Sequence, residues 1–440
     1  MGRLFLIAAR NLRSNRRRTL MLGGAIATVT MLLVILSSAA NGIQETMLRA
    51  ATTLSTGHVN VGGFFKITSG QASPVVTHFA PLKQLVIDEV PEAAVVVDRV
   101  RGWGKVVSHK NSLQVGLSGV DIDQEDGFHK VLELVEGDLD GLREPNTLLL
   151  FESQAERLDV KVGDALTLSA PTVRGSFNAV GVTVVGIAKN IGFISGFSVF
   201  TPKETIREMY LMDDSATGAI QIYLKDYEDA EEVAERLRQR LSVAIDEERI
   251  AAKGILEPLS KPFWMKFQTV TREDWTGQKL DITTWKDEMK FLTWTIQAFD
   301  SLTFAVVGTL MVIILIGVMN SMWMAIRERT QEIGTLRAIG MGRGGVMMMF
   351  VVEASLLSFG ATIAGALGGA LVATIVNALE IGISKGFQLF LMRDTLYLSV
   401  NPTIVLTAIA IITVVVTIFS IYPALKAARL RPVTAMQHIG

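Results

Sequence analysis

Long stretches without a charged residue constrain this 440-residue chain more than any other feature. A bilayer core about 30 Å thick is crossed by roughly 20 apolar helical residues. Residues 19–44 and 301–326 each contain 26 uncharged residues in a row, and two further apolar stretches lie at 344–379 and 396–425. Because the apolar part of a signal peptide is only about 7–15 residues long, we expect the first stretch to be an uncleaved span. The sequence therefore predicts four transmembrane helices, with one large domain between the first and second.

The charges are distributed unequally between the segments that flank these spans. Residues 1–18, 327–343 and 426–440 together carry 13 basic and two acidic residues, whereas residues 45–300 carry 27 basic and 38 acidic residues. Basic residues next to a span are retained on the cytoplasmic side. We therefore expect both termini in the cytoplasm and the large domain outside, which is the periplasm if the chain lies in a bacterial inner membrane.

The large segment has both α and β signals. Runs of β-branched or alternating residues at Val95–Val100, Gly181–Ala188 and Gly218–Leu224 predict strands. Asp229–Val243 has apolar residues at helical spacing behind an aspartate that can cap a helix. We therefore expect an α+β domain.

Helix-compatible patterns also join this domain to the membrane. Ile43–Leu54 and Thr284–Phe299 continue into the first and second spans without a Gly or Pro break, and we expect them to form two helical stalks. The predicted order is a basic amphipathic cytoplasmic helix (1–18), the first span (19–44), the external α+β domain with its stalks (45–300), the second span (301–326), a cytoplasmic helix (327–343), the third span (344–379), a short external loop (380–395), the fourth span (396–425) and a cytoplasmic tail (426–440).

No pattern in the sequence indicates catalysis, a metal site or a resident cofactor. The chain contains no cysteine, its five histidines are widely separated, and it lacks the G-x-x-x-x-G-K-[ST] phosphate loop, so we do not expect it to hydrolyse ATP alone. Gly340, Gly342 and Gly345 match G-x-G-x-x-G, but they follow a charged helical segment and not a strand. We interpret them as a flexible turn between helices. Nothing indicates binding to nucleic acid.

An acidic stretch imitates the start of a calcium-binding loop. Asp121, Asp123 and Glu125 have the right spacing, but the sixth position is Asp126 in place of Gly and the twelfth is Leu132 in place of Glu. We expect a solvated acidic loop.

Three residues within the third span have specific interpretations. Gly365 and Gly369 form G-x-x-x-G, which lets two helices approach closely. We favour close packing within the helix bundle over a seam between two copies. Glu353 is an intramembrane carboxylate, for which we favour a structural hydrogen-bonding role over a direct functional one.

The segment Arg327–Val346 combines many charges with Ile333, Leu336 and Ile339 at helical spacing, which predicts an amphipathic helix beneath the membrane. Its apolar stripe fits packing under the bundle and fits docking of a cytoplasmic partner equally well.

The residues RERTQEIGTLRAIGMGRGGVMMMFVVEASLLSFGATIAGALGG (Arg327–Gly369) resemble the signature of the FtsX-like or MacB-type ABC transporter permeases. The chain's YPALKAARLRPVTAMQ (Tyr422–Gln437) is similar to the closing pattern of that family, and AARNLRSNRRRT is similar to its basic N-terminal helix. The four-span layout with one large external domain is also that of the family.

This resemblance implies a dimer of permeases, identical or merely similar, bound to two separately encoded cytoplasmic ATPases that hold ATP and Mg²⁺. It also implies that movement of the ATPases is passed to the external domain, which is called mechanotransmission. The residues that would couple to the ATPase are Glu332, Ile333, Gly334, Leu336, Arg337 and Gly340.

Within the family, the lipoprotein-releasing branch is the most similar. Asn41-Gly42 followed by Glu45 resembles its N-G-x-x-x-E stretch, and LLLFESQAERLDVKVGDALTL resembles a segment of its external domain. Such a permease would extract lipoproteins from the outer leaflet and pass them to a periplasmic carrier. Alternatives are export of a drug, toxin or peptide through an adaptor and an outer-membrane duct, and a signalling lever that controls a cell-wall hydrolase. For extraction, we expect a lipid-facing groove between the first two spans, lined by Val34, Leu36, Phe304 and Val307.

Overall fold

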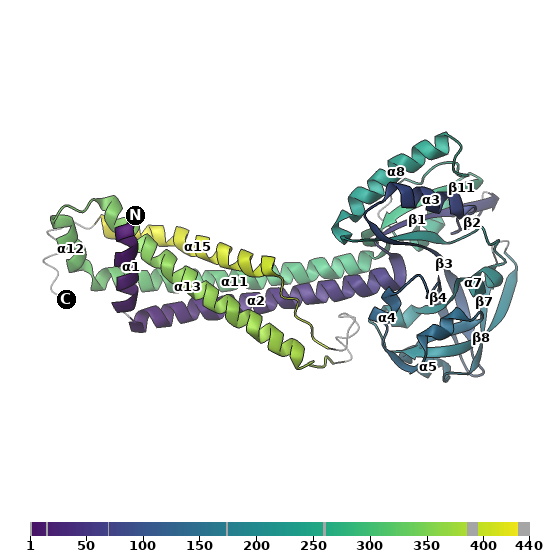
Figure 1. Cartoon of the computed structure of the whole chain (residues 1–440), viewed down its shortest axis with the longest axis horizontal. Coiled ribbons are helices and arrows are strands. Elements are labelled where there is room, and N and C mark those ends of the chain that lie inside the picture. Colours follow the sequence, from purple (N-terminus) through teal and green to yellow (C-terminus); the bar gives the residue numbers. More distant parts are fainter. Residues whose placement is uncertain are drawn as a thin grey trace. The chain divides into compact units, whose positions relative to one another are not determined.

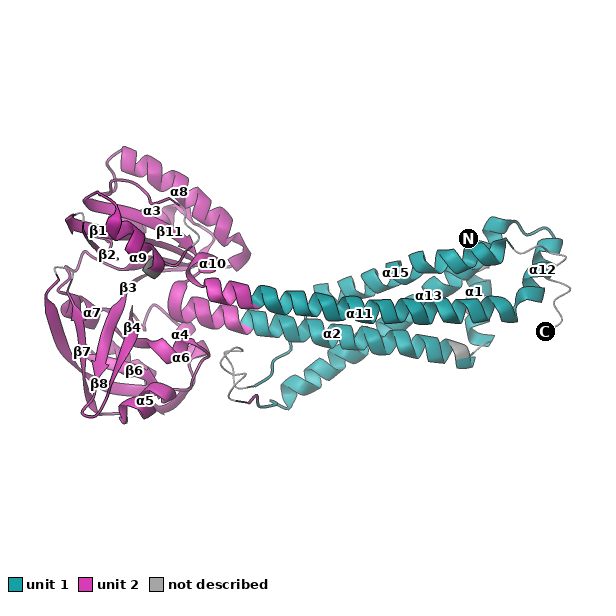
Figure 2. Ribbon diagram, turned by 180° about the vertical axis from the view of Figure 1, so that it is seen from behind, with its two compact units in different colours: residues 1–45, 296–382, 395–440 teal, residues 46–295, 383–394 magenta. Residues whose placement is uncertain are grey.

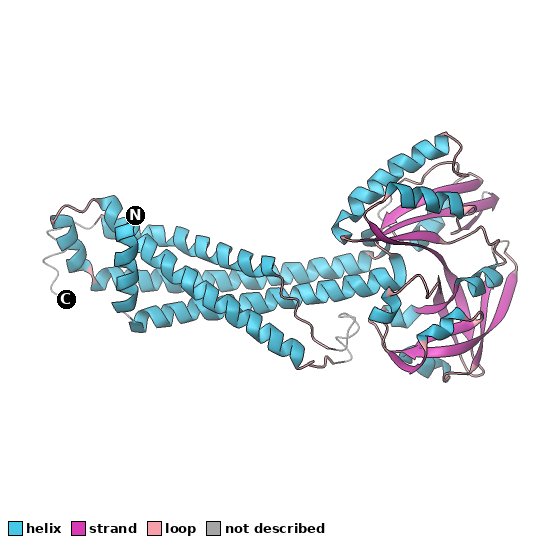
Figure 3. Ribbon diagram, in the orientation of Figure 1, coloured by secondary structure: helices cyan, strands magenta, loops and turns pink. Residues whose placement is uncertain are grey.

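The computed structural model describes residues 2–14, 16–68, 70–172, 175–257, 261–384 and 395–429. The chain divides into two compact units, which Figure 2 colours separately. Unit 1 comprises residues 1–45, 296–382 and 395–440, and unit 2 comprises residues 46–295 and 383–394. Figure 3 shows that the described part of unit 1 is built from helices, whereas the long strands lie in unit 2.

Four helices among the described residues are long and apolar enough to cross a membrane, and they run alongside one another in Figure 1. The predicted fold of four spans and one α+β domain is therefore confirmed. The helices that form unit 1 in whole or in part are α1 (Gly2–Ser14), α2 (Arg16–Ala51), α11 (Lys290–Glu328), α12 (Thr330–Ala338), α13 (Arg343–Ala378) and α15 (Pro402–Ala428).

The helices differ from the predicted spans mainly at their ends. Both α2 and α11 continue well beyond the apolar stretches at 19–44 and 301–326. The helix of the fourth span begins at Pro402 and not at residue 396, because Asn401 caps it and proline suits the first helical turn. Residues 385–394 of the predicted loop and 430–440 of the predicted tail lie outside the described residues.

One buried apolar cluster contains side chains from α2, α11, α12, α13 and α15. Helix α13 lies directly against α2 within it, because a Cβ atom at Gly365 would stand 2.2 Å from the carbonyl oxygen of Ala27. A Cβ at Gly369 would stand 2.9 Å from the Cβ of Val34. The G-x-x-x-G pattern therefore serves close packing within the bundle, as we favoured.

Unit 2 is organised around one extended strand that belongs to two half-sheets. The first part of β3 (Ala93–Val107) pairs with β10 through Arg99, and its second part pairs with β4 from Val100 onwards. The sheet order is β11-β1-β10-β3-β4-β9-β6-β8-β5, with β2 on β1 and β7 on β3 and β8. The other strands are β1 (Val59–Thr68), β2 (Gln71–Ser73), β4 (Ser112–Val120), β5 (Leu134–Gly137), β6 (Thr147–Phe151), β7 (Ala165–Pro171), β8 (Phe177–Ala188), β9 (Ser198–Pro202), β10 (Ala219–Leu224) and β11 (Gly277–Thr284).

Each half-sheet has its own apolar core, one against α3 and α8 and the other against α5 and α7. The helical segments of unit 2 are the π-helical turn η1 (Thr52–Thr56), α3 (Phe79–Glu89), α4 (Gly127–Val131), η2 (Leu139–Arg143), α5 (Glu152–Leu158), α6 (Ile194–Phe197), α7 (Lys203–Tyr210), η3 (Tyr227–Asp229), α8 (Ala230–Asp246), α9 (Phe263–Arg272) and α10 (Trp285–Glu288). Two of the predicted strands lie within β3 and β8, the third matches β10 except for its first residue, Gly218, and the predicted surface helix corresponds to α8.

Two local expectations for unit 2 were wrong. The side chain of Asp229 does not cap α8, because Asp226 caps the short turn η3 that precedes this helix. The second stalk is not helical from Thr284, since that residue ends β11 and forms a capping box with Asp287. The chain leaves helical geometry at Met289, and α11 begins only at Lys290.

Candidate functional site

Helix α12 divides its predicted apolar stripe between the bundle and the surface. Ile333 is 1% exposed and belongs to the bundle core, and Leu336 packs against that core, whereas Ile339 is 80% exposed. Part of the apolar stripe therefore packs against the bundle, whereas Ile339 stays uncovered. Glu332 is exposed as well. Gly340 follows with a φ of +110°, which favours glycine. Gly340 and Gly342 therefore lie in a turn between helices, as interpreted, whereas Gly345 lies in the first turn of α13.

The other predicted coupling residues on α12 face the bundle. Gly334 is buried, and Arg337 donates from Nη1 to the carbonyl oxygen of Ala428 in α15 at 3.1 Å. That bond satisfies a carbonyl at the end of a helix, where no intrahelical partner is available. The six coupling residues stay a prediction.

Glu353 of α13 is bonded to two elements that both precede it in the chain. Arg329, at the junction of α11 and α12, donates from Nη1 to the Glu353 carboxylate at 3.1 Å. Asn11 of α1 donates to the same oxygen at 3.4 Å. Arg329 and Glu353 are 8% and 6% exposed. A buried charge requires such a partner, so this site ties the base of α12 to α1 and α13.

The stretch Asn41-Gly42 to Glu45 holds the segment that precedes α15. A Cβ at Gly42 would stand 2.0 Å from the carbonyl oxygen of Tyr397, so only glycine leaves room for that segment. The hydroxyl of Ser399 donates to the Glu45 carboxylate at 2.9 Å. The side chain of Asn377 in α13 pairs with both backbone groups of Leu398 at 2.9 Å.

The four predicted groove residues do not share one environment. Val34 is completely buried against Gly369 and lines no surface in this conformation. Phe304 is 80% exposed, and Leu36 and Val307 are half-buried. The groove prediction therefore rests on Leu36, Phe304 and Val307.

In unit 2, a completely buried arginine holds the turn that follows α2. Arg99 of β3 donates from Nη1 to the carbonyl oxygen of Leu54 at 3.0 Å and from Nη2 to that of Thr53 at 3.2 Å. Its guanidinium also pairs with the Glu125 carboxylate and lies over the ring of Phe128. The π-helical turn is thereby fixed to the sheet, and such turns often occur at functional positions.

The acidic loop keeps Asp123 and Asp126 exposed, as expected, but it also forms ion pairs and buries Glu125. Glu125 is 5% exposed, Asp123 pairs with Arg143 at 2.7 Å, and Asp121 accepts from Lys203 at 3.0 Å. Among the described residues, no group of His, Asp and Glu side chains is arranged to hold a metal ion.

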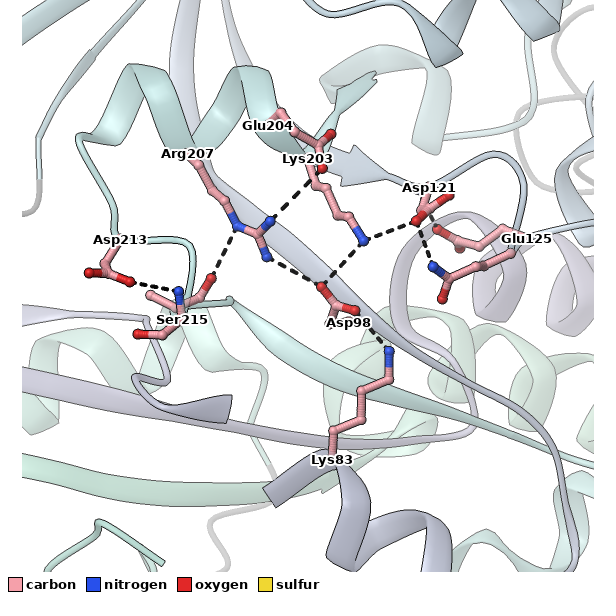
Figure 4. A network of polar contacts seen from close by, with 11 residues as sticks. Lys83, Asp98, Asp121, Glu125, Lys203, Glu204, Arg207, Asp213 and Ser215 are labelled. Atoms are coloured by element: carbon pink, nitrogen blue, oxygen red, sulfur yellow. Dashed lines mark hydrogen bonds and ion pairs between the residues drawn. The ribbon is translucent and has the colours of Figure 1, made fainter. Parts of the chain in front are cut away.

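A buried carboxylate on β3, that of Asp98, joins elements from both half-sheets, as Figure 4 shows. Asp98 accepts from Lys83 of α3 at 2.9 Å and pairs with Arg207 and Lys203 of α7 at 3.4 and 3.6 Å. Burial raises the pKa of Asp98, but the hydrogen bond from Lys83 and the three positive charges outweigh it, so the pKa is lower than usual. Asp98 therefore stays ionised and links α3 to α7.

The sequence interpretation missed Arg99 and Asp98, although a signal was present. Both stand inside an otherwise apolar β-branched run, Val95–Val100. Charged residues in a strand that is buried on both faces must find partners. Their partners come from segments far away in the chain, which the sequence pattern does not identify.

These observations define a class of protein, namely a four-span membrane unit with a short helix between the second and third spans and an inserted α+β domain. Residues 304–432 match the FtsX-like permease C-terminal domain, and residues 19–240 match the MacB-like periplasmic core domain. The latter match spans half of the chain. The chain therefore belongs to the family of FtsX-like permeases with a MacB-like periplasmic core domain.

The two relatives described next each match less than a third of this chain and less than a fifth of their own length. The macrolide export ATP-binding/permease protein MacB of Chromobacterium violaceum is 35% identical over 121 residues, which are 28% of this chain and 17% of that protein. The pyoverdine export ATP-binding/permease protein PvdT of Pseudomonas fluorescens is 38% identical over 121 residues, which are 28% of this chain and 16% of that protein. The crystal structure of the periplasmic region of MacB from Actinobacillus actinomycetemcomitans aligns with 55% of this chain and 94% of its own, at 12% identity and a TM-score of 0.30.

Proposed function

We propose that the chain is the permease subunit of an ABC transporter that works by mechanotransmission. The observation that carries this proposal is the continuity of α2. One helix runs from Arg16 to Ala51 and passes directly into the π-helical turn that Arg99 fixes to the sheet of unit 2. A displacement of this helix would therefore be transmitted to β3 without a flexible linker.

The proposed attachment for the ATPase is the exposed side of α12. Ile339 and Glu332 are exposed there, and Arg329 connects the base of the helix to Glu353. Movement of α12 would thus be passed to α13 and α1. The proposed partners are two cytoplasmic ABC ATPases that bind ATP and Mg²⁺, a second permease that is identical or similar, and membrane lipid. The proposed location is a bacterial inner membrane, with both termini in the cytoplasm.

For the cargo, we propose lipoproteins that are extracted from the outer leaflet for transfer to the outer membrane. Each methylene withdrawn from a bilayer costs about 0.8 kcal/mol, so a multiply acylated anchor needs another apolar surface to receive its chains. Phe304, Leu36 and Val307 are the candidate surface in unit 1. A periplasmic carrier or adaptor would then take the cargo.

A second candidate is export of a small molecule or peptide. The relatives named above are a macrolide exporter and a pyoverdine exporter, which favours this alternative. A signalling lever without cargo is a third possibility that the fold also accommodates.

The docking proposal is tested by exchanging Ile339 for glutamate and measuring copurification with the ATPase. We expect Ile339→Glu to abolish the complex, because it places a charge on the uncovered apolar position. Leu379→Glu is the matched control, since Leu379 is 66% exposed at the other end of α13 and should leave the complex intact. A complex that withstands Ile339→Glu would reject this docking face.

The cargo proposal is tested in liposomes that contain the chain, its ATPase and a triacylated protein. We expect ATP-dependent release of that protein to a soluble acceptor, and Phe304→Asp should stop release while ATPase binding persists. No release, together with stimulation of ATP hydrolysis by a small amphiphile, would favour export instead.

A further inference from the structure

Strand β3 has a gap along one edge, between the two strands that pair there. Pairing with β10 ends at Arg99, and pairing with β7 begins at Lys105. Within the gap, the hydroxyl of Tyr210 accepts from the backbone N–H of Trp103 at 2.8 Å and donates to its carbonyl oxygen at 2.7 Å. Gly102 makes this possible, because a Cβ there would stand 2.3 Å from the Tyr210 hydroxyl.

A cavity of about 350 Å³ opens at this gap within unit 2. Its volume lies at the lower end of the range for ligand pockets, about 300–1,000 Å³. The walls are mainly apolar and include aromatic rings that retain exposed surface, Trp103 at 40% and Phe267 at 39%. The lining side chains used below are Val75, Trp103, Tyr210, Met212 and Phe267. Arg101 also lines the cavity, and its guanidinium pairs with the buried carboxylate of Glu288 at 3.8 Å.

The chemistry of these walls favours an aliphatic ligand. The Tyr210 hydroxyl is already committed to the backbone of Trp103, so it has little capacity for a polar ligand. Burial raises the pKa of Tyr210 to about 12, so the ring stays neutral at physiological pH. Exposed aromatic and aliphatic surface of this kind gains free energy by covering apolar atoms. The limited volume suits one chain and not several.

The cavity is also connected to the start of α11 through aromatic rings. The ring of Trp103 stacks on that of Phe197 at 6.5 Å, and Phe197 stacks on Phe193 at 5.9 Å. Phe193 meets Phe291 of α11 edge-on at 5.6 Å. A ligand that moves Trp103 would therefore act on a row of packed rings that ends at this helix.

We propose that this cavity binds a single aliphatic chain of an acylated amphiphile. The chain can come from a lipid-anchored protein or from a membrane lipid, which present the same methylene chemistry. This proposal is separate from the groove in unit 1 and holds whichever cargo the transporter moves.

The test uses the full chain in phospholipid nanodiscs and a lysophospholipid whose acyl chain carries a photoreactive diazirine. After illumination, mass spectrometry of the digested protein should find the probe on peptides that contain Trp103 and Phe267. We expect Phe267→Lys to reduce labelling of the Trp103 peptide at least tenfold, because it places a charge in the cavity wall. Met265→Lys is the matched control, since Met265 lies on the same helix, is 57% exposed and does not line the cavity.

A second measurement on the unaltered chain does not depend on any variant folding. Unlabelled lysophospholipids of increasing chain length should compete about fourfold better per added methylene, which corresponds to about 0.8 kcal/mol, until the cavity is full and the gain stops. Labelling that is equal in Phe267→Lys and Met265→Lys, or competition that never levels off, would show partition into the bilayer and overturn the proposal.

A triacylated lipopeptide distinguishes the two sources of the chain. If it competes with the probe, the cavity accepts the chain of a lipid-anchored cargo. If only lysophospholipid competes, the cavity accepts a membrane lipid. Both results uphold the binding of one aliphatic chain, and the absence of competition by either would overturn it.

Discussion

Each unit contains a buried pair of an arginine and a glutamate, and the two pairs differ in what else the arginine holds. In unit 1, Arg329 is bonded to the carboxylate of Glu353, which also accepts from Asn11. In unit 2, Arg99 is bonded to the carboxylate of Glu125 and to two backbone carbonyl groups as well.

The difference follows from the kind of backbone around each pair. The helices around Glu353 satisfy their own backbone groups, so the arginine there connects side chains across helices. The turn Thr52–Thr56 ends a helix, where carbonyl groups lack intrahelical partners, and Arg99 supplies donors for two of them. The Arg329 pair therefore joins elements, whereas the Arg99 pair completes a helix terminus and joins it to a sheet.

Removal of Arg99 should have the largest effect. Arg99→Met leaves Glu125 buried without its cation and two carbonyl groups without donors, and breaking a buried pair in this way costs about 3–5 kcal/mol. We expect faster hydrogen exchange at residues 46–56 and a lower unfolding temperature of unit 2. The control is Arg249→Met, since the Arg249 side chain is 65% exposed and its surface pair contributes little. Equal exchange in the two variants would contradict the proposed role of Arg99.

Lysine substitution should separate the two pairs, because lysine keeps the charge but loses the planar fork of donors. Arg99→Lys cannot serve a carboxylate and two carbonyl groups in the same geometry, and we expect a loss of about 1.5–3 kcal/mol. Arg329→Lys can still present its charge to Glu353 and should cost less than about 1 kcal/mol. Thermal unfolding in nanodiscs measures both. If both variants lost the same stability, the proposed difference between the two arginines would be wrong: Arg99 would not depend on its bonds to the helix end any more than Arg329 depends on its single carboxylate partner.

The packing of unit 1 should be sensitive where backbones meet. Gly365→Ala puts a methyl group against the carbonyl oxygen of Ala27, and overpacking of this kind costs about 1–3 kcal/mol. Gly360→Ala on the same helix has no described atom within 4 Å of its new methyl group and should be neutral or slightly stabilising. The stability of unit 1 in nanodiscs checks both. If the two variants had the same stability, α13 and α2 would move apart to admit a methyl group more easily than their close contact suggests.

Local sequence patterns predicted the elements of both units but not the contacts that join them. Long apolar stretches located four helices, β-branched runs located β3 and β8, and alternation located β10. The small-residue spacing of Gly365 and Gly369 predicted a close approach, because it encodes a shape that lies on one helix face. Burial of Glu353 beside a hydrogen-bond donor followed from the cost of an intramembrane charge.

The remaining contacts depend on partners that are distant in sequence. Glu125 was assigned to solvent because nothing near it in the chain indicates that Arg99 would reach it. Ile339 shares its spacing with Ile333, yet it lies past the last residue of α12, directly before the turn at Gly340. Only the folded backbone decides such cases.

The stability of the two units should also respond differently to pH, and this effect should be smaller than those of the substitutions above. The described histidines all lie in unit 2, and His58 accepts at Nδ1 from the backbone N–H of Leu224 at 2.9 Å. Burial lowers the pKa of His58 below its ordinary value, although the charge of Asp226 acts in the other direction. The folded state therefore binds fewer protons at His58 than the unfolded state does. The contribution of neutral His58 to the stability of unit 2 is complete above about pH 6.5, and it is lost as the pH falls through the lower pKa of the folded state.

We expect unit 2 to lose stability between pH 7.5 and 5.5, as measured by hydrogen exchange of β10, while α13 in unit 1 is unchanged. His58→Gln can still accept from Leu224 but cannot titrate, and it should flatten the dependence; an unaltered slope in that variant would assign the effect to other groups.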